Sequence, residues 1–188
     1  MHKSLTNQTM RRNNFSIVYF FFFLLMACNK AVDELPTLTQ NGANTFGAKV
    51  DGILWVPKGF GPFPASNLLE ARFTTPTSIL INARNFASSP NETGFEILVS
   101  GVTGPGTYAL NTNVTLPAIT GYGYYLKNRL TPQDEWLTTA EYTGTVTISR
   151  LDIANKIVAG TFQFNALSLY NTTHAIHVTD GRFDIKYK

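Results

Sequence analysis

A short segment near the C-terminus has the residue types of a metal site, because it contains His174, His177 and Asp180. On a regular strand, residues three apart point to opposite faces of a sheet. The two imidazoles therefore cannot bind one ion unless a β-bulge re-aims one of them. We expect these histidines to lie at an edge or in a loop, and we expect no metal and no other cofactor.

Paired carboxylates could serve a hydrolase, and the one adjacent acidic pair of the expected folded region is Asp134-Glu135. Glycoside hydrolysis uses two such groups at set separations. Adjacent residues diverge on any regular element, so a solvated loop or a first-turn position fits this pair better. The chain also lacks a Gly-x-Ser-x-Gly elbow, and its glycine-rich segment 101–106 lacks the Lys-Ser/Thr of a phosphate loop. We expect no catalytic residue.

Aromatic residues are the best candidates for ligand binding. The segment 121–125 contains Tyr122, Tyr124 and Tyr125 beside glycines that leave the rings less covered, and Trp136 follows. Such rings stack on the apolar faces of sugars or peptides while polar neighbours fix the orientation. The alternative is that each ring packs in the core or at its rim. We predict these four residues as the ligand-binding set.

The single cysteine, Cys28, indicates a different chemistry. It follows Ala27 and an apolar run, 15–26, which is preceded by Arg11-Arg12. A basic region, a short apolar region and a small residue before the cleavage site form a secretory signal. A cysteine directly after that site resembles a bacterial lipoprotein signal, in which the thiol is acylated and the residue becomes the new N-terminus.

The apolar run is too short to span a bilayer, because 12 helical residues cover about 18 Å of a core about 30 Å thick. We interpret residues 1–27 as a lipoprotein signal peptide, with Met10 as an alternative start. The mature protein is then held at a lipid bilayer through acylated Cys28. This predicts a lipid-anchored protein of the cell envelope, at the outer membrane.

Removal of the signal changes the net charge. The whole chain has 15 basic and 12 acidic residues, for a net charge of +3. The signal contains Lys3, Arg11 and Arg12 and no acidic residue, which leaves 12 basic against 12 acidic residues. A neutral domain without a basic run lacks the electrostatic footprint of nucleic-acid binding. We expect no nucleic-acid partner.

The elements that position these residues have a period of two. Segments 46–50 and 53–56 flank Asp51-Gly52, a dipeptide typical of a type I′ hairpin turn. Further strands are predicted at 68–74, 79–84, 95–99, 107–110, 119–126, 145–149, 157–166 and 182–187. Segment 127–141 is ambiguous, because Thr131-Pro132 resembles the N-cap and first position of a helical turn.

Strands with one apolar and one polar face are typical of antiparallel sheets packed on a core. Together with the lack of a long helical pattern, they predict an all-β fold, either an antiparallel β-sandwich or a closed or half-open β-barrel. We expect one sandwich domain over 45–188. A chain of about 150 residues buries on folding roughly 70% of the surface that it exposes when unfolded, which is enough for one hydrophobic core. Residues 28–44 are polar and aperiodic, so they predict a lipidated N-terminus and a flexible linker.

The hairpins also resemble a known family. Small Bacteroidota lipoproteins built on a domain of unknown function show similar segments, here 44–57, 105–108, 144–152, 155–164 and 178–187. The resemblance extends from about residue 44 to 188. Its motifs are turns and alternating strands, so it implies an all-β lipoprotein and carries no activity and no catalytic residue.

These observations predict a monomeric envelope lipoprotein of the non-catalytic kind, a binding or accessory module for a glycan, a peptide or an envelope protein. The alternative is a structural or assembly lipoprotein that contacts a partner by pairing of sheet edges. An enzyme ranks third. A concave aromatic groove would favour the binding module, and a long exposed edge strand would favour the assembly lipoprotein. Two carboxylates converging in a deep cleft would favour an enzyme.

Overall fold

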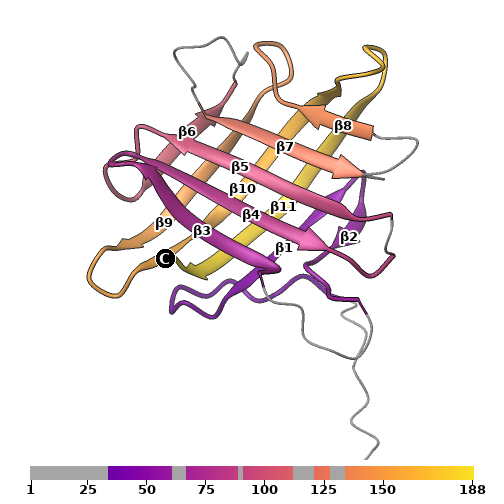
Figure 1. Cartoon of the computed structure of the whole chain (residues 1–188). Coiled ribbons are helices and arrows are strands. Elements are labelled where there is room, and N and C mark those ends of the chain that lie inside the picture. Colours follow the sequence, from indigo (N-terminus) through magenta and orange to yellow (C-terminus); the bar gives the residue numbers. More distant parts are fainter. Residues whose placement is uncertain (1–33, 61–66, 89–90, 112–120, 128–133) are drawn as a thin grey trace, which may run out of the picture. The chain divides into compact units, whose positions relative to one another are not determined.

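The computed structural model describes residues 34–60, 67–88, 91–111, 121–127 and 134–188. This part of the chain contains 11 antiparallel strands and no helix (Figure 1). In chain order they are β1 (Thr45–Val50), β2 (Ile53–Trp55), β3 (Leu69–Thr75), β4 (Ser78–Asn85), β5 (Thr93–Ser100), β6 (Gly106–Leu110), β7 (Tyr122–Lys127), β8 (Asp134–Leu137), β9 (Gly144–Asp152), β10 (Ile157–Ser168) and β11 (Ala175–Lys186). The predicted all-β class is confirmed.

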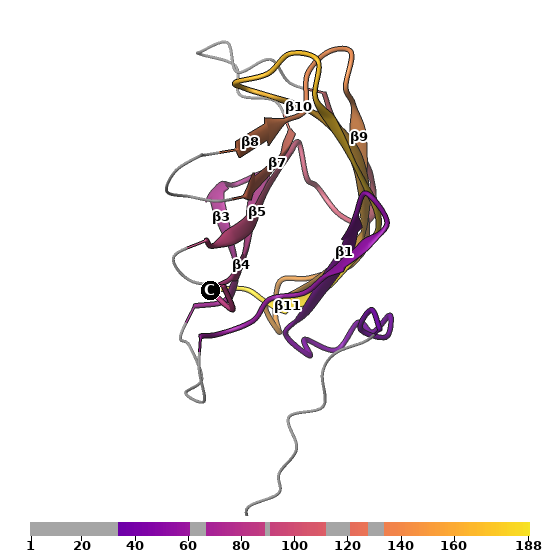
Figure 2. The same cartoon turned by 90° about the vertical axis from the view of Figure 1, so that its right-hand side faces the viewer.

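The strands form one open sheet that folds over into two layers (Figure 2). The hydrogen-bonded path is β2-β1-β11-β10-β8-β7-β5-β4-β3, and β9 lies beside β10 and also pairs with β6. One layer contains β1, β9, β10 and β11, and the other contains β3, β4, β5, β7 and β8. Within the described residues the end strands β2 and β3 do not pair, so the sheet is a sandwich and not a closed barrel.

Strand β10 belongs to both layers. Over Ile157–Phe164 it pairs with β9, and at Leu167 and Ser168 it pairs with β8. Its other edge pairs with β11 from Ile157 to Leu167. Strand β10 is therefore the place at which the sheet passes from one layer to the other.

The two layers meet in an aromatic core. Phe46 on β1 contacts Phe95 on β5 and Phe162 on β10, with ring centroids 5.6 and 5.1 Å apart. All three rings are buried. Burial of each one contributes about 1.5–3 kcal/mol, so these contacts between distant strands hold the layers together.

The turn between β1 and β2 has the predicted geometry. Asp51 and Gly52 have φ angles of 49° and 80°, and Val50 pairs with Ile53 across them. Both turn residues occupy the left-handed region that a type I′ turn requires. This hairpin is confirmed.

Residues 34–44 contain no strand, yet they are held against β11. The carboxylate of Asp184 is 1% exposed. It accepts hydrogen bonds from the Thr39 hydroxyl (2.6 Å) and from the backbone N–H groups of Asn41 (3.0 Å), Gly42 (2.7 Å) and Ala43 (3.2 Å). The compact unit begins at Asp33, inside the segment 28–44 for which the sequence predicts a flexible linker.

The sequence-based interpretation left one segment open and is wrong at two places on β11. The segment left open, 127–141, contains strand β8 at Asp134–Leu137, and Thr131-Pro132, which suggested a helical turn, lies outside the described residues. In the strand predicted at 182–187, Asp184 alternates with the apolar Phe183 and Ile185 and is therefore expected to face water, whereas residues 39–43 cover it. In addition, β11 starts at Ala175, well before the predicted strand at 182.

The predicted signal peptide, residues 1–27, and the predicted lipidation site, Cys28, lie outside the described residues. Among the residues that the structure describes, no helix has the length and apolar character needed to cross a membrane.

Candidate functional site

Strands β7 and β8 divide the four predicted aromatic residues between two surfaces. Tyr122 and Tyr124 point away from the core and are half-buried, whereas Tyr125 points inward and is buried. Trp136 on β8 is directly opposite Tyr125 and is also buried. The structure therefore places Tyr122 and Tyr124 on the outer side of the sheet and Tyr125 and Trp136 on its inner side.

The glycines beside the tyrosines serve packing. A Cβ atom on Gly123 would lie 2.8 Å from Cδ1 of the Phe164 ring, which is closer than side chains tolerate. Gly123 faces inward and lets Phe164 of β10 pack across β7. The exposure of Tyr122 and Tyr124 follows from strand alternation and not from the missing side chains.

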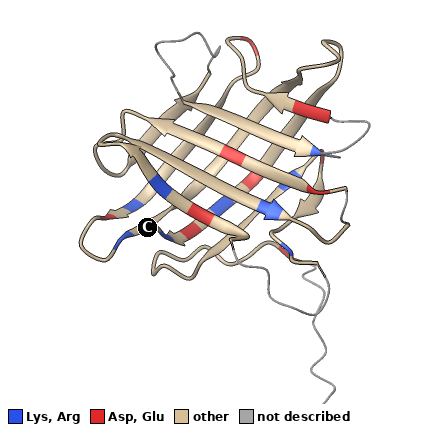
Figure 3. Ribbon diagram, viewed as in Figure 1, with Lys and Arg blue, Asp and Glu red and all other residues tan. Residues whose placement is uncertain are grey.

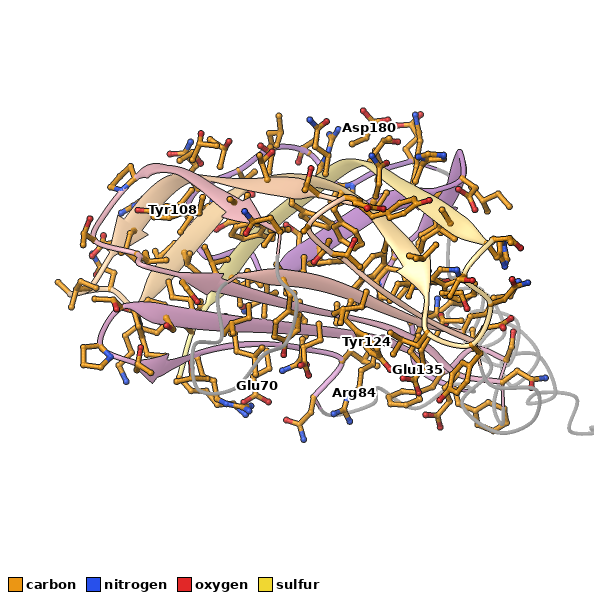
Figure 4. All side chains as sticks on the ribbon, turned by 90° about the horizontal axis from the view of Figure 1, so that it is seen from above. Glu70, Arg84, Tyr108, Tyr124, Glu135 and Asp180 are labelled. Carbon is orange, nitrogen blue, oxygen red and sulfur yellow. The ribbon has the colours of Figure 1, made fainter. Side chains whose placement is uncertain are left out.

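A groove of about 310 Å³ lies on the outer face of β4, β5, β7 and β8. We call it the outer groove. Figure 4 shows Arg84, Tyr124 and Glu135 on the same outer side of this layer, although each comes from a different strand. Its principal outward-facing side chains are those of Asn82, Arg84, Glu96, Tyr124, Leu126 and Glu135. Phe86 and Glu92 also line the groove.

Two rows of cross-strand neighbours form the floor of the outer groove. The first row is Asn82, Glu96 and Tyr124, and the second is Arg84, Gly94, Leu126 and Glu135. Gly94 has no side chain, so the second row is hollow between Arg84 and Leu126. The register of four strands thus creates a depression with a polar row along one side.

Each outward-facing tyrosine of β7 is paired with a carboxylate. The Tyr122 hydroxyl donates a short hydrogen bond to Oε1 of Glu96, and the Tyr124 hydroxyl is bonded to Glu135. Burial, together with the adjacent carboxylate, raises the pKa of both Tyr122 and Tyr124 well above the usual value. Both hydroxyls therefore stay protonated at neutral pH and hold the carboxylates in fixed positions.

A loop residue extends the aromatic surface. Tyr170, which follows β10, is 65% exposed and lies close enough to Tyr124 to influence its pKa. The loop is held there because the Leu169 N–H donates to the Glu135 carbonyl at 2.8 Å. An exposed ring therefore lies in the neighbourhood of Tyr124.

The groove combines opposite charges. Figure 3 shows basic segments on β3 and β4 and acidic segments on β3, β5 and β8, all in the same layer. Within the groove, Arg84 supplies a cation and Glu96 and Glu135 supply anions. Asp134 does not join them, because it lies on the opposite side of β8 from Glu135, as expected for adjacent residues.

A second pocket, of about 270 Å³, lies beside the Asp51-Gly52 turn and contains the other aromatic pair. We call it the end pocket. Tyr125 and Trp136 line it, together with residues of β1, β2 and β11. The outer groove and the end pocket share no lining residue.

The two histidines have separate neighbours. The His174 ring meets Trp136 edge-on, with centroids 5.4 Å apart, and Nδ1 of His177 is 2.7 Å from Oδ1 of Asn165. Asp180 forms a salt bridge of 2.8 Å with Lys49. Within the described ranges, no cluster of three His, Cys, Asp or Glu residues has the arrangement of a metal site.

Residues 44–184 match the model of the family described as "Domain of unknown function (DUF6252)". The chain belongs to this family. No curated protein and no solved structure matches it. The DUF6252 match includes every residue of both the outer groove and the end pocket, so both belong to the family domain. The expectation that a domain of unknown function covers most of the chain is confirmed.

Sequence reasoning missed several groove residues of this DUF6252 domain. Glu96 and Arg84 occupy polar positions of predicted strands, and their alternation could have placed them on an outer face. Nothing local in the sequence pairs Glu96 with Tyr124, because that contact depends on β5 pairing with β7 and not with β6. Tyr170 lies in a loop, where periodicity gives no signal.

Proposed function

We propose that this protein is a lipid-anchored carbohydrate-binding protein of a bacterial cell envelope and that it holds its ligand in the outer groove without catalysis. The observation that carries the proposal is the pair of tyrosine hydroxyls fixed to Glu96 and Glu135 beside an open groove. The signal-like segment before Cys28 and the resemblance to Bacteroidota lipoproteins support the location at an outer membrane.

The polar row of the groove fits the hydroxyl groups of a sugar. Glu96 and Glu135 accept hydrogen bonds, and Asn82 and Arg84 donate them. Because tyrosine hydroxyls already hold the two carboxylates, little side-chain entropy is lost when a ligand binds. A preorganised set of donors and acceptors is what recognition of a hydroxyl-rich ligand requires.

Aromatic surface borders this polar row. Tyr124 and Phe86 line the groove, and the exposed Tyr170 lies near Tyr124. Rings of this kind contact the apolar face of a pyranose while polar groups read its edges. The groove is shallow, so we expect weak affinity, with a dissociation constant of about 0.1–1 mM. Retention at a membrane surface compensates for weak binding by keeping many copies near the same polymer.

The position of the carboxylates supports binding more than catalysis. Each one is engaged by a tyrosine hydroxyl, so part of its hydrogen-bonding capacity is already used. For this reason we favour ligand binding over hydrolysis as the function of the groove. Pairing of sheet edges is also less favoured, because the end strand β2 spans only three residues and the Lys188 N–H already donates to Ala71 on β3.

The test is a glycan array, followed by titration calorimetry of any hit, with the mature acylated protein in detergent micelles. We expect signal for one class of polysaccharide. Tyr124→Phe should weaken the hit by about two- to twelvefold, the value of one hydrogen bond. Glu135→Gln should weaken it at least as much.

A matched control is Gln163→Ala, because Gln163 is exposed on β10 in the opposite layer. We expect it to bind like the unaltered protein. The proposal fails if a broad array gives no signal, or if Gln163→Ala weakens binding as much as Tyr124→Phe.

A further inference from the structure

The outer groove has an excess of negative charge. Among the described residues, its lining contains three carboxylates, those of Glu92, Glu96 and Glu135, and one guanidinium, that of Arg84, for a net charge of −2. An open groove with a net charge attracts ligands of the opposite sign and repels ligands of the same sign. The charge of the lining therefore restricts the glycans that the groove accepts.

The charges are separated along the groove. Glu96 on β5 and Glu135 on β8 belong to the two strands that pair with β7, so they flank the outward face of β7 from opposite sides. Arg84 is on β4, three strand spacings from Glu135, which corresponds to about 14 Å between their backbones. The end of the groove that β7 and β8 form is therefore its anionic end.

Both of these carboxylates act on the Tyr124 hydroxyl. Burial raises the pKa of Tyr124, and the hydrogen bond to Glu135 (Figure 4) and the charges of Glu135 and Glu96 raise it further. The Tyr122 hydroxyl donates to Oε1 of Glu96 and holds that side chain in place. A carboxylate has about four acceptor sites, so a hydrogen bond from one tyrosine uses only part of its accepting capacity. Two positioned acceptors with a full charge each therefore lie near one phenol.

A primary ammonium group complements this end of the groove. It has a positive charge and three N–H donors, whereas a sugar hydroxyl has no charge and one donor. Hydrogen bonds between charged groups are also about twice as strong as those between neutral groups. Within the described ranges, no three His, Cys, Asp or Glu side chains have the arrangement of a metal site, so these carboxylates suit an organic cation better than a metal ion.

We propose that the outer groove selects glycans with free amino groups, such as a polymer of glucosamine, and that an ammonium group of the ligand binds between Glu96 and Glu135 beside Tyr124. This inference rests on the carbohydrate function proposed above and names the class of glycan. N-acetylation of the sugar removes the positive charge, and an acidic sugar brings a charge that the lining repels. Either change therefore weakens binding.

The test is titration calorimetry of the mature acylated protein in a neutral detergent at about pH 6, where a sugar amine carries its proton. The three ligands are tetramers of glucosamine, of N-acetylglucosamine and of galacturonic acid. We expect the glucosamine tetramer to bind about tenfold more tightly than the N-acetylated one, the value of one charged hydrogen bond, and the galacturonate tetramer to bind most weakly. Added salt should weaken the binding of the glucosamine tetramer and change that of the N-acetylated tetramer little.

Two substitutions with opposite effects on the charge form a matched pair. Glu96→Gln keeps an oxygen for the Tyr122 hydroxyl and removes a negative charge, so the preference for the glucosamine tetramer over the N-acetylated one should fall to about threefold. Arg84→Gln removes a positive charge, so it should raise that preference above the value of the unaltered protein. Structural damage to the groove would instead weaken the binding of both tetramers in both variants.

The outcomes distinguish this inference from the proposed function. If the N-acetylated or the galacturonate tetramer binds as tightly as the glucosamine tetramer, or if Arg84→Gln lowers the preference, carbohydrate binding stands and selection of amino sugars is overturned. Tetralysine has the charge without the sugar and should bind more weakly than the glucosamine tetramer; equal binding would indicate a cationic peptide ligand and overturn the inference. If no glycan binds, the proposed function and this inference both fail.

Discussion

The carboxylate of Asp184 on β11 accepts a hydrogen bond of 2.7 Å from the backbone N–H of Gly42, 142 positions away in the sequence. Burial of Asp184 raises its pKa, but the hydrogen bonds from Thr39 and from residues 41–43 outweigh this effect and keep the pKa below the usual value. This contact joins the segment before the sandwich to the centre of one layer.

Asp184→Asn should destabilise the fold by about 2–4 kcal/mol, because an amide NH₂ replaces an acceptor that faces several N–H donors. Urea unfolding monitored by tryptophan fluorescence measures the change. The matched control is Asp180→Asn on the same strand, since Asp180 is exposed and solvent screens its ion pair with Lys49. Equal effects of the two substitutions would contradict this account.

The same contact should make the stability of the fold depend on pH. The pKa of Asp184 is lower in the folded state than in the unfolded state, where it is about 3.9. The stabilisation is therefore complete above that value and is lost as the pH falls through the folded pKa. Limited proteolysis between about pH 7 and pH 2 should show cleavage near residues 39–43 only at the acidic end. In Asp184→Asn these residues should be cleaved already at neutral pH.

Gly123→Ala should destabilise the sandwich by about 1–3 kcal/mol, because the new Cβ would approach the Phe164 ring to 2.8 Å. Thermal unfolding followed by circular dichroism measures the loss. Gly104→Ala is the matched control, since a Cβ at Gly104 meets no atom within 4 Å. We expect the control to change stability by less than about 0.5 kcal/mol.

We expect the free energy of unfolding to decrease at alkaline pH because of Tyr125. Burial raises the pKa of Tyr125 to about 12. An unfolded tyrosine ionises near pH 10, so the stabilisation is present below about pH 10 and is lost as the pH rises toward 12. Unfolding free energies at pH 9 and pH 11 should differ less in Tyr125→Phe than in the unaltered protein. An identical pH dependence in both would show that Tyr125 is not responsible.

Cys28→Ser should move the protein from the membrane fraction to the soluble fraction, because it removes the thiol that carries the proposed lipid. Stable anchoring takes two or more acyl chains, and a serine cannot receive a thioether-linked group. Ultracentrifugation after carbonate washing, with metabolic fatty-acid labelling, makes the measurement. Asn29→Ser is the control, because it changes the neighbouring residue and keeps the thiol. A fully membrane-bound Cys28→Ser protein would rule out this anchor.

Local sequence signals predicted most strands and one turn of this fold. The turn at Asp51-Gly52 could be predicted because both residues tolerate positive φ. Strand β10 could be predicted because its apolar and polar residues alternate over 12 residues. Strand β8 was missed because it is only four residues long and lies beside a sequence that resembles a helix start. Short strands depend on their neighbours, here β7 and β10, for stability.

Contacts between distant segments account for what the sequence did not predict. Alternation correctly placed Phe183 and Ile185 inward, but it also predicted an exposed Asp184, since a covering segment 142 positions away leaves no trace in the local pattern. The outer groove is similar. The residue types of Tyr124 and Glu135 were visible, whereas the strand order that joins them to Glu96 was not.

Strand β8 separates the outer groove from the end pocket by the thickness of a single backbone. Glu135 lies on the side of the outer groove and Trp136 on the side of the end pocket. Only two residue pairs join β8 to β10. We therefore expect the backbone amides of β8 to exchange with solvent faster than those of β10, which is paired along most of its length on both edges.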